Sequence, residues 1–324
     1  MDQWNQLLQN ISSRPKQNNP ECEKIFNGPS GIIPGWEQLL IDRFGSFLFV
    51  VTYRPLEEEQ QEGLIGLLGE LYPLCKLRIQ YRSAGRAEDL YLSADCPERI
   101  EVKEHGITYL VHTSRGQNPG FFADMINGRK AVMDYIDRSR QESESEDLLP
   151  VLNLFAYTCS FSVAALKGGA SRVDNWDMNK YSLAIGKKNH EINKLDPRLS
   201  SYFGYDIFKS FGKIKKRGPY SLVILDPPPQ QGSSFQYKKD YPRLMQRLEQ
   251  ILAPAGAVLF CLNASDFGKQ DFLDMINAET PGTFDHIDDI PCPPEYLGRF
   301  PDRGLKTFLA SGYNPKKYPE EGKS

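Results

Sequence analysis

The chain has 324 residues, of which 40% are hydrophobic and 25% charged, and its formal net charge is -3 at pH 7. This length predicts two domains, and the composition is that of a globular protein. The negative charge gives no general attraction to nucleic acid, and no apolar run reaches the ~20 residues of a membrane-spanning helix. Because the N-terminus also lacks the apolar stretch of a secretory signal, we expect a soluble, cytoplasmic protein.

Cysteine and histidine spacing gives no indication of a metal site or a disulfide framework. The chain has six cysteines without a CxxC pair, and none of its four histidines stands at ligand spacing from another histidine or from a cysteine. We therefore expect neither a metal ion nor disulfide bonds.

The first third of the chain predicts a small α+β domain over residues 36–114. Residues 1–35 precede it and are rich in Asn, Gln, Pro and Gly, which indicates an extended lead-in. The elements expected in the domain are a hairpin over 38–53, a helix over 56–71, a strand over 74–82 and a second hairpin over 100–113. No pattern in this part suggests catalysis.

A connecting segment is expected over 115–149. It begins with the stretch RGQNPGFFAD (115–124), continues as a predicted helix over 127–139 and ends in the acidic run QESESED (141–147). Such a run is typical of an exposed linker, so the boundary between the domains is expected near it.

The remaining residues, 150–324, alternate short apolar strands with amphipathic helices. The expected strands are 151–157, 172–177, 201–205, 221–226 and 257–262, with late candidates at 284–290 and 306–311, and the helices include 180–193 and 237–252. Strands that alternate with helices form a parallel sheet through right-handed crossovers. The sequence therefore predicts an α/β fold, a Rossmann-like sheet of seven strands accompanied by the smaller N-terminal α+β domain.

Polar residues follow these strands at the edge where an open parallel sheet binds its ligand. The first strand runs into Ala-Tyr-Thr-Cys-Ser at 156–160, and Asp177, Asp206 and Asp226 follow the second, third and fourth strands. Asp177 stands where a carboxylate accepts hydrogen bonds from both ribose hydroxyls, and Asp206 where one accepts the adenine amino group. These strand ends predict a nucleoside site.

The absence of one glycine-rich motif indicates which nucleoside cofactor this site binds. The chain has no GxGxxG, whose glycines let a helix N-terminus approach a pyrophosphate. S-adenosylmethionine (SAM) carries no phosphate and tolerates a looser first turn. SAM is therefore the expected cofactor, in place of a dinucleotide.

With these features the chain resembles the bacterial class I SAM-dependent methyltransferases of large-subunit ribosomal RNA. The resemblance runs from about Gln38 to the end and is carried by RGQNPGFFAD (115–124), VLNLFAYTCSFSVAAL (151–166), NHEINKLD (189–196), Asp206 and DPPP (226–229). In that family the first segment covers the SAM pocket, the second contacts the methionine end, and two aspartates bind ribose and adenine. The cofactor contacts implied are Phe122, Asp124, Asn153, Phe155, Tyr157, Thr158, Asp177, Met178, Asp206, Ile207 and Asp226.

The resemblance also implies that the smaller domain helps to hold RNA. The sequence departs from the family at one place, because Cys159 and Ser160 follow Thr158 where Tyr-Thr-Gly is usual. If this turn needs a positive φ, the cysteine lacks conformational freedom that a glycine would have. Thiol chemistry at Cys159 is not expected, since no histidine stands near it in sequence to act as a base.

The end of the fourth strand indicates which atom receives the methyl group. Carbon-5 methylation of cytosine needs a cysteine nucleophile just after the fifth strand, but this chain has Asn263 there and Cys261 inside the strand. The run from Asp226 is closer to the [Asp/Asn]-Pro-Pro-aromatic motif of enzymes that methylate nitrogen. In that motif the side chain and a proline-fixed carbonyl accept hydrogen bonds from the target amine and orient its lone pair. The expected catalytic residues are therefore Asp226, Pro227 and Pro228.

The expected contacts with the target base surround this motif. Pro229 replaces the usual stacking aromatic, and Phe235 or Tyr237 in the following loop would stack instead. Asn263 completes the candidate substrate site. A turn-forming role for DPPP is the simpler alternative. The basic run 209–217 (KSFGKIKKR) is expected to form a solvated helix face and loop, with a patch that contacts phosphate as the alternative.

The leading hypothesis is an enzyme that transfers a methyl group from SAM to a base nitrogen of RNA. The resemblance implies guanine in 23S ribosomal RNA as its target. Two alternatives stay open. One is a SAM enzyme acting on a protein or a small molecule, which the negative net charge favours; the other is a non-catalytic RNA-binding assembly factor, which Cys159 favours. None of the three involves a membrane or a metal.

Overall fold

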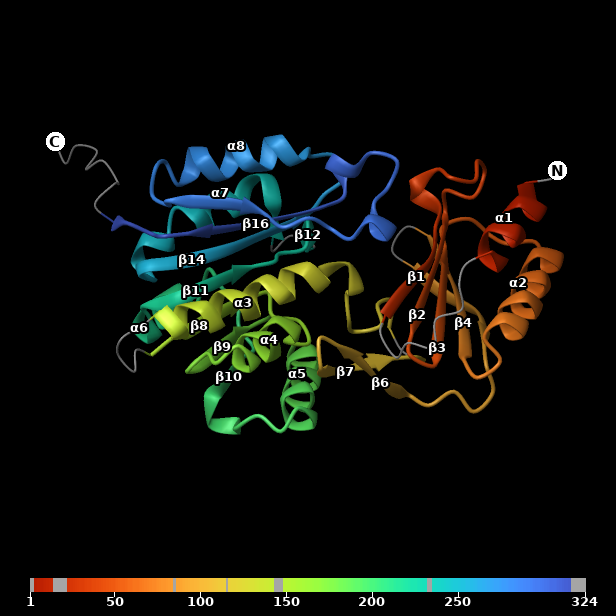
Figure 1. The fold of residues 1–324 in the computed structure, drawn as a ribbon, viewed down its shortest axis with the longest axis horizontal. Coiled ribbons are helices and arrows are strands. Elements are labelled where there is room, and N and C mark those ends of the chain that lie inside the picture. The colour runs from red at the N-terminus through yellow and green to blue at the C-terminus, as the bar shows by residue number, and fades with distance from the viewer. Residues whose placement is uncertain are drawn as a thin grey trace. The chain divides into compact units, whose positions relative to one another are not determined.

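The computed structural model describes residues 3–13, 22–83, 86–114, 116–142, 148–231 and 235–315. The chain forms two compact units, each of which is shown in Figure 1. The first unit comprises Met1–Ala123 and Pro293–Pro301, and the second comprises Asp124–Cys292 and Asp302–Ser324.

The first unit is built on a five-stranded sheet in the order β1-β2-β3-β4-β5. Its elements are α1 (Gln3–Ser12), β1 (Cys22–Asn27), β2 (Leu39–Phe44), β3 (Phe47–Thr52), α2 (Glu58–Leu71), β4 (Lys76–Ser83), β5 (Arg86–Leu92), β6 (Arg99–Glu104) and β7 (Ile107–His112). Strands β3 and β4 are parallel and joined through α2, whereas the other neighbours are antiparallel. Strands β6 and β7 pair as a separate hairpin. Both expected hairpins are thus present.

The expectation of an extended lead-in over 1–35 is wrong for the described part of that range. Helix α1 buries Leu7 and Ile11 in the core of the first unit, together with Leu64 and Leu68 of α2. Residues three and four apart lie on one face of a helix, so Trp4, Leu7 and Ile11 dock this short element together. Strand β1 then pairs with β2 and places itself at the edge of the sheet.

The second unit contains a seven-stranded sheet in the order β10-β9-β8-β11-β14-β16-β15, which confirms the Rossmann-like prediction. The neighbours from β10 to β14 pair in parallel. Strand β16 pairs antiparallel with both β14 and β15. The strands are β8 (Pro150–Leu154), β9 (Arg172–Trp176), β10 (Ser200–Phe203), β11 (Tyr220–Leu225), β14 (Leu252–Asn263), β15 (His286–Asp289) and β16 (Leu305–Ser311). A small hairpin joins β12 (Gln230–Gln231) to β13 (Phe235–Gln236).

Helices cover both faces of this sheet (Figure 1). They are α3 (Ile126–Glu142), α4 (Ser160–Lys167), α5 (Lys180–Ile192), α6 (Phe211–Arg217), α7 (Tyr237–Met245) and α8 (Lys269–Glu279). The 3₁₀ turns are η1 (Gly28–Ser30), η2 (Ala123–Met125), η3 (Pro197–Leu199), η4 (Leu248–Gln250), η5 (Pro294–Tyr296) and η6 (Pro301–Arg303). Alternate strand residues serve the two faces: Leu222 and Ile224 pack with α3 and α4, whereas Val223 and Leu225 pack with α6, α7 and α8.

The division between the units differs from the boundary expected near 141–147. Helix α3 belongs to the second unit, because Val132 and Ile136 pack against Phe161 of α4 in that core. The unit therefore begins at Asp124, well before the acidic run, whose residues 143–147 lie outside the described residues. The segment Pro293–Pro301 returns to the first unit, where Asn27 donates to the carbonyls of Glu295 and Leu297.

Candidate active site

Four parallel strands of the second unit end at one level. Leu154 of β8 pairs with Trp176 of β9 and with Leu225 of β11, and Trp176 pairs with Phe203 of β10. The residues that leave the sheet at this edge are Phe155, Asp177, Gly204 and Asp226. Because strand order reverses between β8 and β11, this edge is where an open α/β sheet binds a ligand.

The turn after β8 has a left-handed backbone at three residues that are not glycine. Phe155, Tyr157 and Cys159 have φ values of 58°, 48° and 60°. This conformation costs an L-residue roughly 1–2 kcal/mol, whereas glycine adopts it freely. The strand therefore ends at Leu154 instead of the expected residue 157, and the turn does need a positive φ at Cys159.

Asp177 holds this turn from the end of the neighbouring strand. Its Oδ2 accepts a hydrogen bond from the Tyr157 amide at 2.8 Å, and its Oδ1 accepts from the Asn179 amide at 2.7 Å. Burial raises the pKa of the Asp177 carboxyl, and the two amides partly offset that rise. The half-buried carboxylate thus fixes the strained backbone and still has lone pairs for further donors.

Helix α5 supports the same turn with two residues one helical turn apart. The Asn189 side chain donates to the Thr158 carbonyl at 2.9 Å. Gly186 faces Cys159 so closely that a Cβ at position 186 would lie 2.3 Å from the Cys159 sulfur. The buried cysteine side chain is therefore accommodated only because residue 186 has none.

A buried chain of hydrogen bonds connects β8 to α5. Asn153 donates to Asn175 at 3.0 Å, Asn175 donates to Ser162 at 3.1 Å, and the Ser162 hydroxyl lies 2.8 Å from His190 Nε2. His190 Nδ1 lies 2.7 Å from the Gly186 carbonyl, which can only accept, so Nδ1 carries a proton. Burial lowers the pKa of His190, which favours the neutral ring whose Nε2 accepts from Ser162. The direction of every bond, and with it the orientation of the Asn153 amide, is thereby fixed.

Asp226 is half-buried at the end of β11. Burial raises the pKa of its carboxyl to about 7, the negative charge of Asp124 adds to the rise, and Arg129 opposes it. Pro227, Pro228 and Pro229 follow and offer no amide donors that could hold the carboxylate ionised. The group can therefore take up or release a proton near neutral pH.

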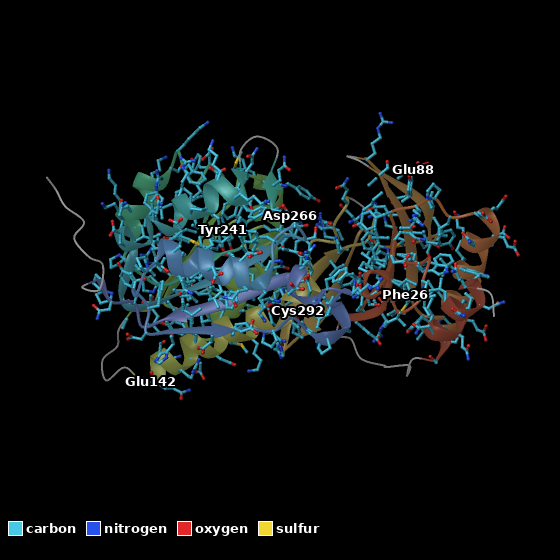
Figure 2. The ribbon with its side chains drawn as sticks, turned by 90° about the horizontal axis from the view of Figure 1, so that it is seen from above. Phe26, Glu88, Glu142, Tyr241, Asp266 and Cys292 are labelled. Carbon is cyan, nitrogen blue, oxygen red and sulfur yellow. The ribbon has the colours of Figure 1, made fainter. Side chains whose placement is uncertain are left out.

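Tyr241 holds the ends of β11 and β14 together behind this carboxyl group. Its hydroxyl lies 3.0 Å from the Leu225 carbonyl oxygen and 3.1 Å from that of Cys261, whose amide donates back to it at 3.2 Å. Figure 2 shows Tyr241 among the packed side chains of the second unit. Cys261 itself is fully buried, and its pKa is raised well above its usual range by burial and by Asp226. Such a thiol is a core residue without nucleophilic character.

The expected base-stacking rings are not available on the surface. Phe235 is 1% exposed and packs edge-on against Phe155, with ring centroids 5.0 Å apart. Tyr237 is 7% exposed, and its hydroxyl donates to Asp266 at 2.9 Å. Asn263, by contrast, is exposed at the end of β14. The Pro229 carbonyl already accepts from the Tyr237 amide at 3.1 Å, so it shapes the loop.

The remaining expected cofactor residues differ in their surroundings. Met178 is exposed directly after Asp177, whereas Ile207 is buried in the core beside α6 and α7. Asp206 accepts from the Lys209 amide at 3.0 Å and so begins the turn that leads to α6. Phe122 is exposed and belongs to the first unit.

Sequence reasoning missed the residues that support the turn from behind. They are Ser162, Asn175, Gly186, Asn189 and His190. Two of them open the NHEINKLD run, whose role had no physical explanation from the sequence. Only long-range geometry gives one, because Asn189 and Thr158 are 31 positions apart.

The described residues contain no group of three or more His, Cys, Asp or Glu side chains that could hold a metal ion. Within the same residues, no helix is both long and apolar enough to cross a membrane.

Comparison with known protein families identifies the family to which this sheet and its candidate site belong. Residues 23–311 match the model of the S-adenosylmethionine-dependent methyltransferases. The chain belongs to this family. SAM is accordingly its cofactor.

Among similar proteins are two curated relatives called ribosomal RNA large subunit methyltransferase I. The protein of Cronobacter sakazakii is 28% identical over 275 residues, which cover 82% of this chain and 66% of the relative. That of Escherichia coli O139:H28 is 32% identical over 213 residues, covering 63% and 50%. This chain thus spans between half and about two thirds of the relatives' length. The solved structure of SMU.776 with SAH shares the methyltransferase fold, with a TM-score of 0.76, 23% identity and coverage of 95% and 79%.

Proposed function

We propose that this methyltransferase transfers a methyl group from SAM to a base nitrogen of RNA, with guanine in large-subunit ribosomal RNA as the target. The observation that carries the proposal is the half-buried carboxyl group of Asp226, with its pKa of about 7, at the end of β11 and followed by three prolines. The names of the two curated relatives support ribosomal RNA as the substrate class. The cytoplasm, where ribosomes are made, is the compartment that this substrate implies.

The residues around the turn after β8 offer a suitable partner for each part of SAM. Burial raises the pKa of the Asp177 carboxyl although two amides already donate to it, and the two hydroxyls of a ribose would supply further donors. Asp206 follows β10, the strand next to β9, and is the proposed partner of the adenine amino group, while exposed Met178 offers an apolar surface for the base. Asn153, oriented by the buried hydrogen-bond chain, and the backbone of Tyr157 are the proposed contacts of the methionine end.

In the reaction, bound SAM supplies an electrophilic methyl group, and the electrons of the broken carbon–sulfur bond remain on sulfur. Asp226 accepts a hydrogen bond from the target amine and receives the proton that the nitrogen loses. The prolines place no amide donor next to the carboxyl group and fix the backbone around it. Orientation of the lone pair supplies the rate gain, and no covalent enzyme–base intermediate is needed.

Transfer of a labelled methyl group from SAM to ribosomal RNA tests the proposal. The RNA comes from a strain that lacks the gene, and nucleoside analysis of the product identifies the methylated atom. We expect labelled N-methylguanine in the RNA fraction. Label in protein or small molecules, or no transfer at all, would identify one of the two alternatives instead.

A second assay separates nitrogen from carbon chemistry. Cys261→Ser should keep most of the transfer, because the buried thiol takes no part in it. A covalent adduct with RNA containing 5-fluorocytosine that is lost in Cys261→Ser would contradict the nitrogen assignment.

A further inference from the structure

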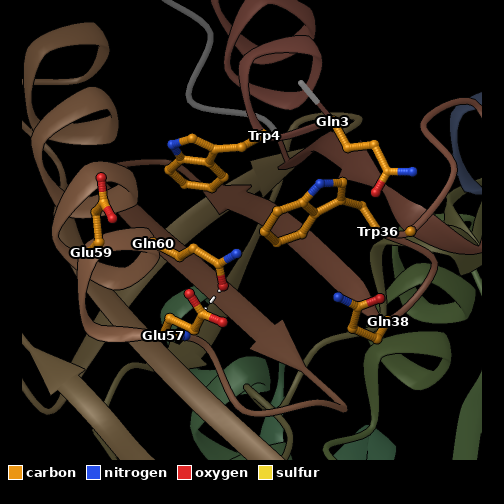
Figure 3. A pocket seen from close by; sticks show the side chains of 8 residues that line it. Gln3, Trp4, Trp36, Gln38, Glu57, Glu59 and Gln60 are labelled. Atoms are coloured by element: carbon orange, nitrogen blue, oxygen red, sulfur yellow. Dashed lines mark hydrogen bonds between the residues drawn. The ribbon is translucent and has the colours of Figure 1, made fainter. Parts of the chain in front are cut away.

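The first unit contains a cavity that plays no part in the methyltransferase site. It has a volume of about 310 Å³ and is lined by Gln3, Trp4, Gly35, Trp36, Gln38, Glu57, Glu59 and Gln60. Figure 3 shows the two indoles at its centre, with Glu57 and Gln38 on the opposite side. A space of this size holds one amino-acid side chain or a similarly small group.

The apolar wall of the cavity is a pair of tryptophans. The rings of Trp4 and Trp36 have centroids 5.3 Å apart and are inclined by 38°; Trp36 is 5% exposed and Trp4 is half-buried, so Trp4 supplies the accessible aromatic surface and Trp36 supports it. Trp4 rests on α2 at Gly63, where a Cβ would lie 2.7 Å from its ring. The indole position therefore depends on the absence of a side chain at position 63.

The polar wall offers acceptors and negative charge. Gln38 Oε1 is buried and has no hydrogen-bond partner among the described residues. A ligand that donates a hydrogen bond to this oxygen would offset the free-energy cost of burying it unpaired. The exposed carboxylates of Glu57 and Glu59 form no ion pair within the described chain. Glu57 is held in place by Gln60, whose Oε1 accepts from the Glu57 amide at 3.2 Å.

We propose that this cavity binds the guanidinium group of an arginine side chain presented by a basic peptide. The group is flat, stacks on an indole face and carries several donors, which match the accessible ring of Trp4 and the unpartnered Gln38 oxygen. Its positive charge suits the two carboxylates. A nucleobase would also stack, but the phosphates of its strand would approach two negative charges that no described residue neutralises.

The test uses the full chain and the simplest probe, Nα-acetyl-L-argininamide. The chain has three tryptophans, so indole ¹⁵N labelling gives three signals. The signals of Trp4 and Trp36 should shift and saturate with the probe. That of Trp176, which is fully buried in the second unit, is the internal reference. Absence of a saturable shift at the first two overturns the proposal.

Matched variants identify the groups responsible. Glu59→Gln removes a lining charge and Gln38→Leu removes the buried acceptor, and each should weaken binding about fivefold at low salt. Glu58→Gln is the control, because Glu58 is an exposed acid of the same helical turn that does not line the cavity. Equal weakening by Glu58→Gln would mean unspecific attraction and would overturn the site.

Two further probes fix the chemistry. Uridine and adenosine monophosphates should leave the Trp4 and Trp36 signals unchanged, and Nα-acetyl-L-lysinamide should bind at least about threefold more weakly because ammonium does not stack. A response to the nucleotides equal to that of the arginine probe would identify a base-stacking platform instead. Gly63→Ala, which displaces Trp4, should abolish the arginine response, while unchanged backbone amide signals from β2 and β3 report that the first unit is still folded.

Discussion

Cys159 and Gly186 illustrate how one residue pair makes an unusual turn possible. Cys159 has a φ of 60° and packs its side chain where a Cβ on Gly186 would lie. The two positions are therefore coupled: glycine at 159 relieves the backbone, and only a small residue at 159 makes space at 186.

A double-mutant cycle measures this coupling. Gly186→Ala should lower the free energy of unfolding by about 2–3 kcal/mol in the wild-type background, because overpacking outweighs the gain in helix propensity. In the Cys159→Gly background the same substitution should cost at least about 1 kcal/mol less. Denaturant unfolding of the four proteins provides the numbers, and additive effects would show that the two residues do not share the space.

Asp177 has two tasks that a single substitution removes together. Asp177→Ala takes away the acceptor for the Tyr157 amide and the proposed partner of the ribose, so SAM affinity should fall by about 2–3 kcal/mol. Asp177→Asn, which keeps one acceptor oxygen, should lose less. Calorimetric titration with SAM compares the three proteins, and an unchanged affinity of Asp177→Ala would remove Asp177 from the cofactor site.

The raised pKa of Asp226 makes stability depend on pH. The folded protein keeps the proton up to pH about 7, whereas the unfolded chain loses it near the ordinary value of 3.8. Folding therefore takes up a proton between these values, and the contribution of this group becomes less favourable as the pH rises through that window. Below it the contribution is constant.

Asp226→Asn should remove this pH dependence. We expect the variant to be more stable than the wild type by on the order of 1–2 kcal/mol at pH 8 and nearly equal at pH 4, a discounted figure because the group is only half-buried. Thermal unfolding at both pH values checks the prediction. Stabilisation that is the same at both would show that burial of the charge is not the cause.

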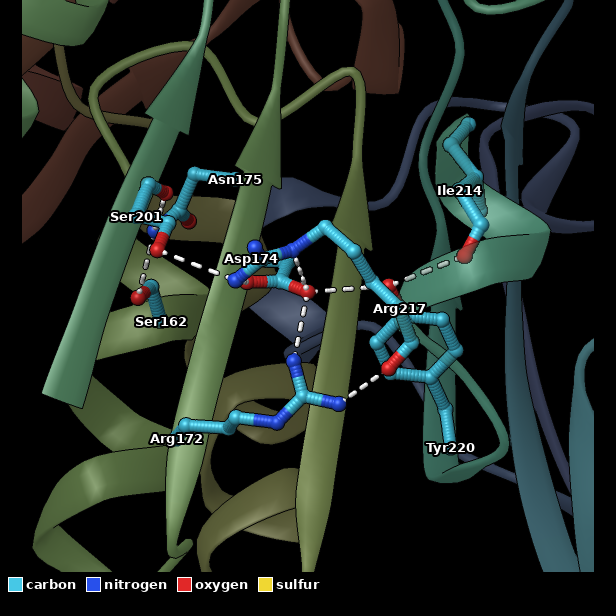
Figure 4. Close-up of polar contacts among 8 residues, drawn as sticks. All are labelled: Ser162, Arg172, Asp174, Asn175, Ser201, Ile214, Arg217 and Tyr220. Atoms are coloured by element: carbon cyan, nitrogen blue, oxygen red, sulfur yellow. Dashed lines mark hydrogen bonds and ion pairs between the residues drawn. The ribbon is translucent and has the colours of Figure 1, made fainter. Parts of the chain in front are cut away.

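At the scale of elements, strand β9 carries a second aspartate with a structural task. Asp174 is buried and accepts from Arg172 at 2.9 Å, from Arg217 at 2.7 and 2.8 Å, and from the Tyr220 hydroxyl at 2.9 Å (Figure 4). One carboxylate thus ties β9 to the end of α6 and the start of β11. Since Asp174 lies three residues before Asp177, stability and cofactor binding can be separated along one strand.

Asp174→Ala should destabilise the protein by about 1–3 kcal/mol, because two guanidinium groups, each about a third exposed, and a hydroxyl lose their shared carboxylate. SAM affinity of the folded fraction should stay within about twofold. Asp134→Ala is the control, since its ion pair with Lys130 is exposed on α3 and should contribute less than about 0.5 kcal/mol. Denaturant unfolding measures both, and a loss no larger than that of the control would contradict the assigned role.

The strands of the second unit were predictable because apolar runs alternate with helices there. The sequence could not indicate where β8 ends, since the left-handed backbone of Phe155 and Tyr157 is imposed by Asp177 and α5. Helix α1 was missed for a different reason. Its apolar residues Trp4, Leu7, Leu8 and Ile11 have the spacing of an amphipathic helix, but the polar composition of the segment was given more weight than this spacing.

At the scale of the whole molecule, domain membership was the least predictable feature. Composition marks 141–147 as a linker, but burial of Val132 and Ile136 assigns α3 to the second unit, and Pro293–Pro301 returns to the first. Aspartates at strand ends were found from topology alone, because parallel strands must expose them at one edge. The burial of Phe235 and Tyr237 could not be predicted from the sequence, since it depends on contacts with Phe155 and Asp266.

Methyl transfer to RNA at Asp226 is tested most directly by single-turnover reaction with unmodified ribosomal RNA, with SAM affinity measured in parallel. Asp226→Ala should lower the rate by ~10–1000-fold and leave SAM affinity nearly unchanged, because the carboxyl group contacts the base. Asp226→Asn should be milder, since the amide oxygen still accepts. A normal rate for Asp226→Ala would make the residue a turn-former, and joint loss of rate and SAM affinity would assign it to the cofactor pocket; either result contradicts the proposed reaction centre.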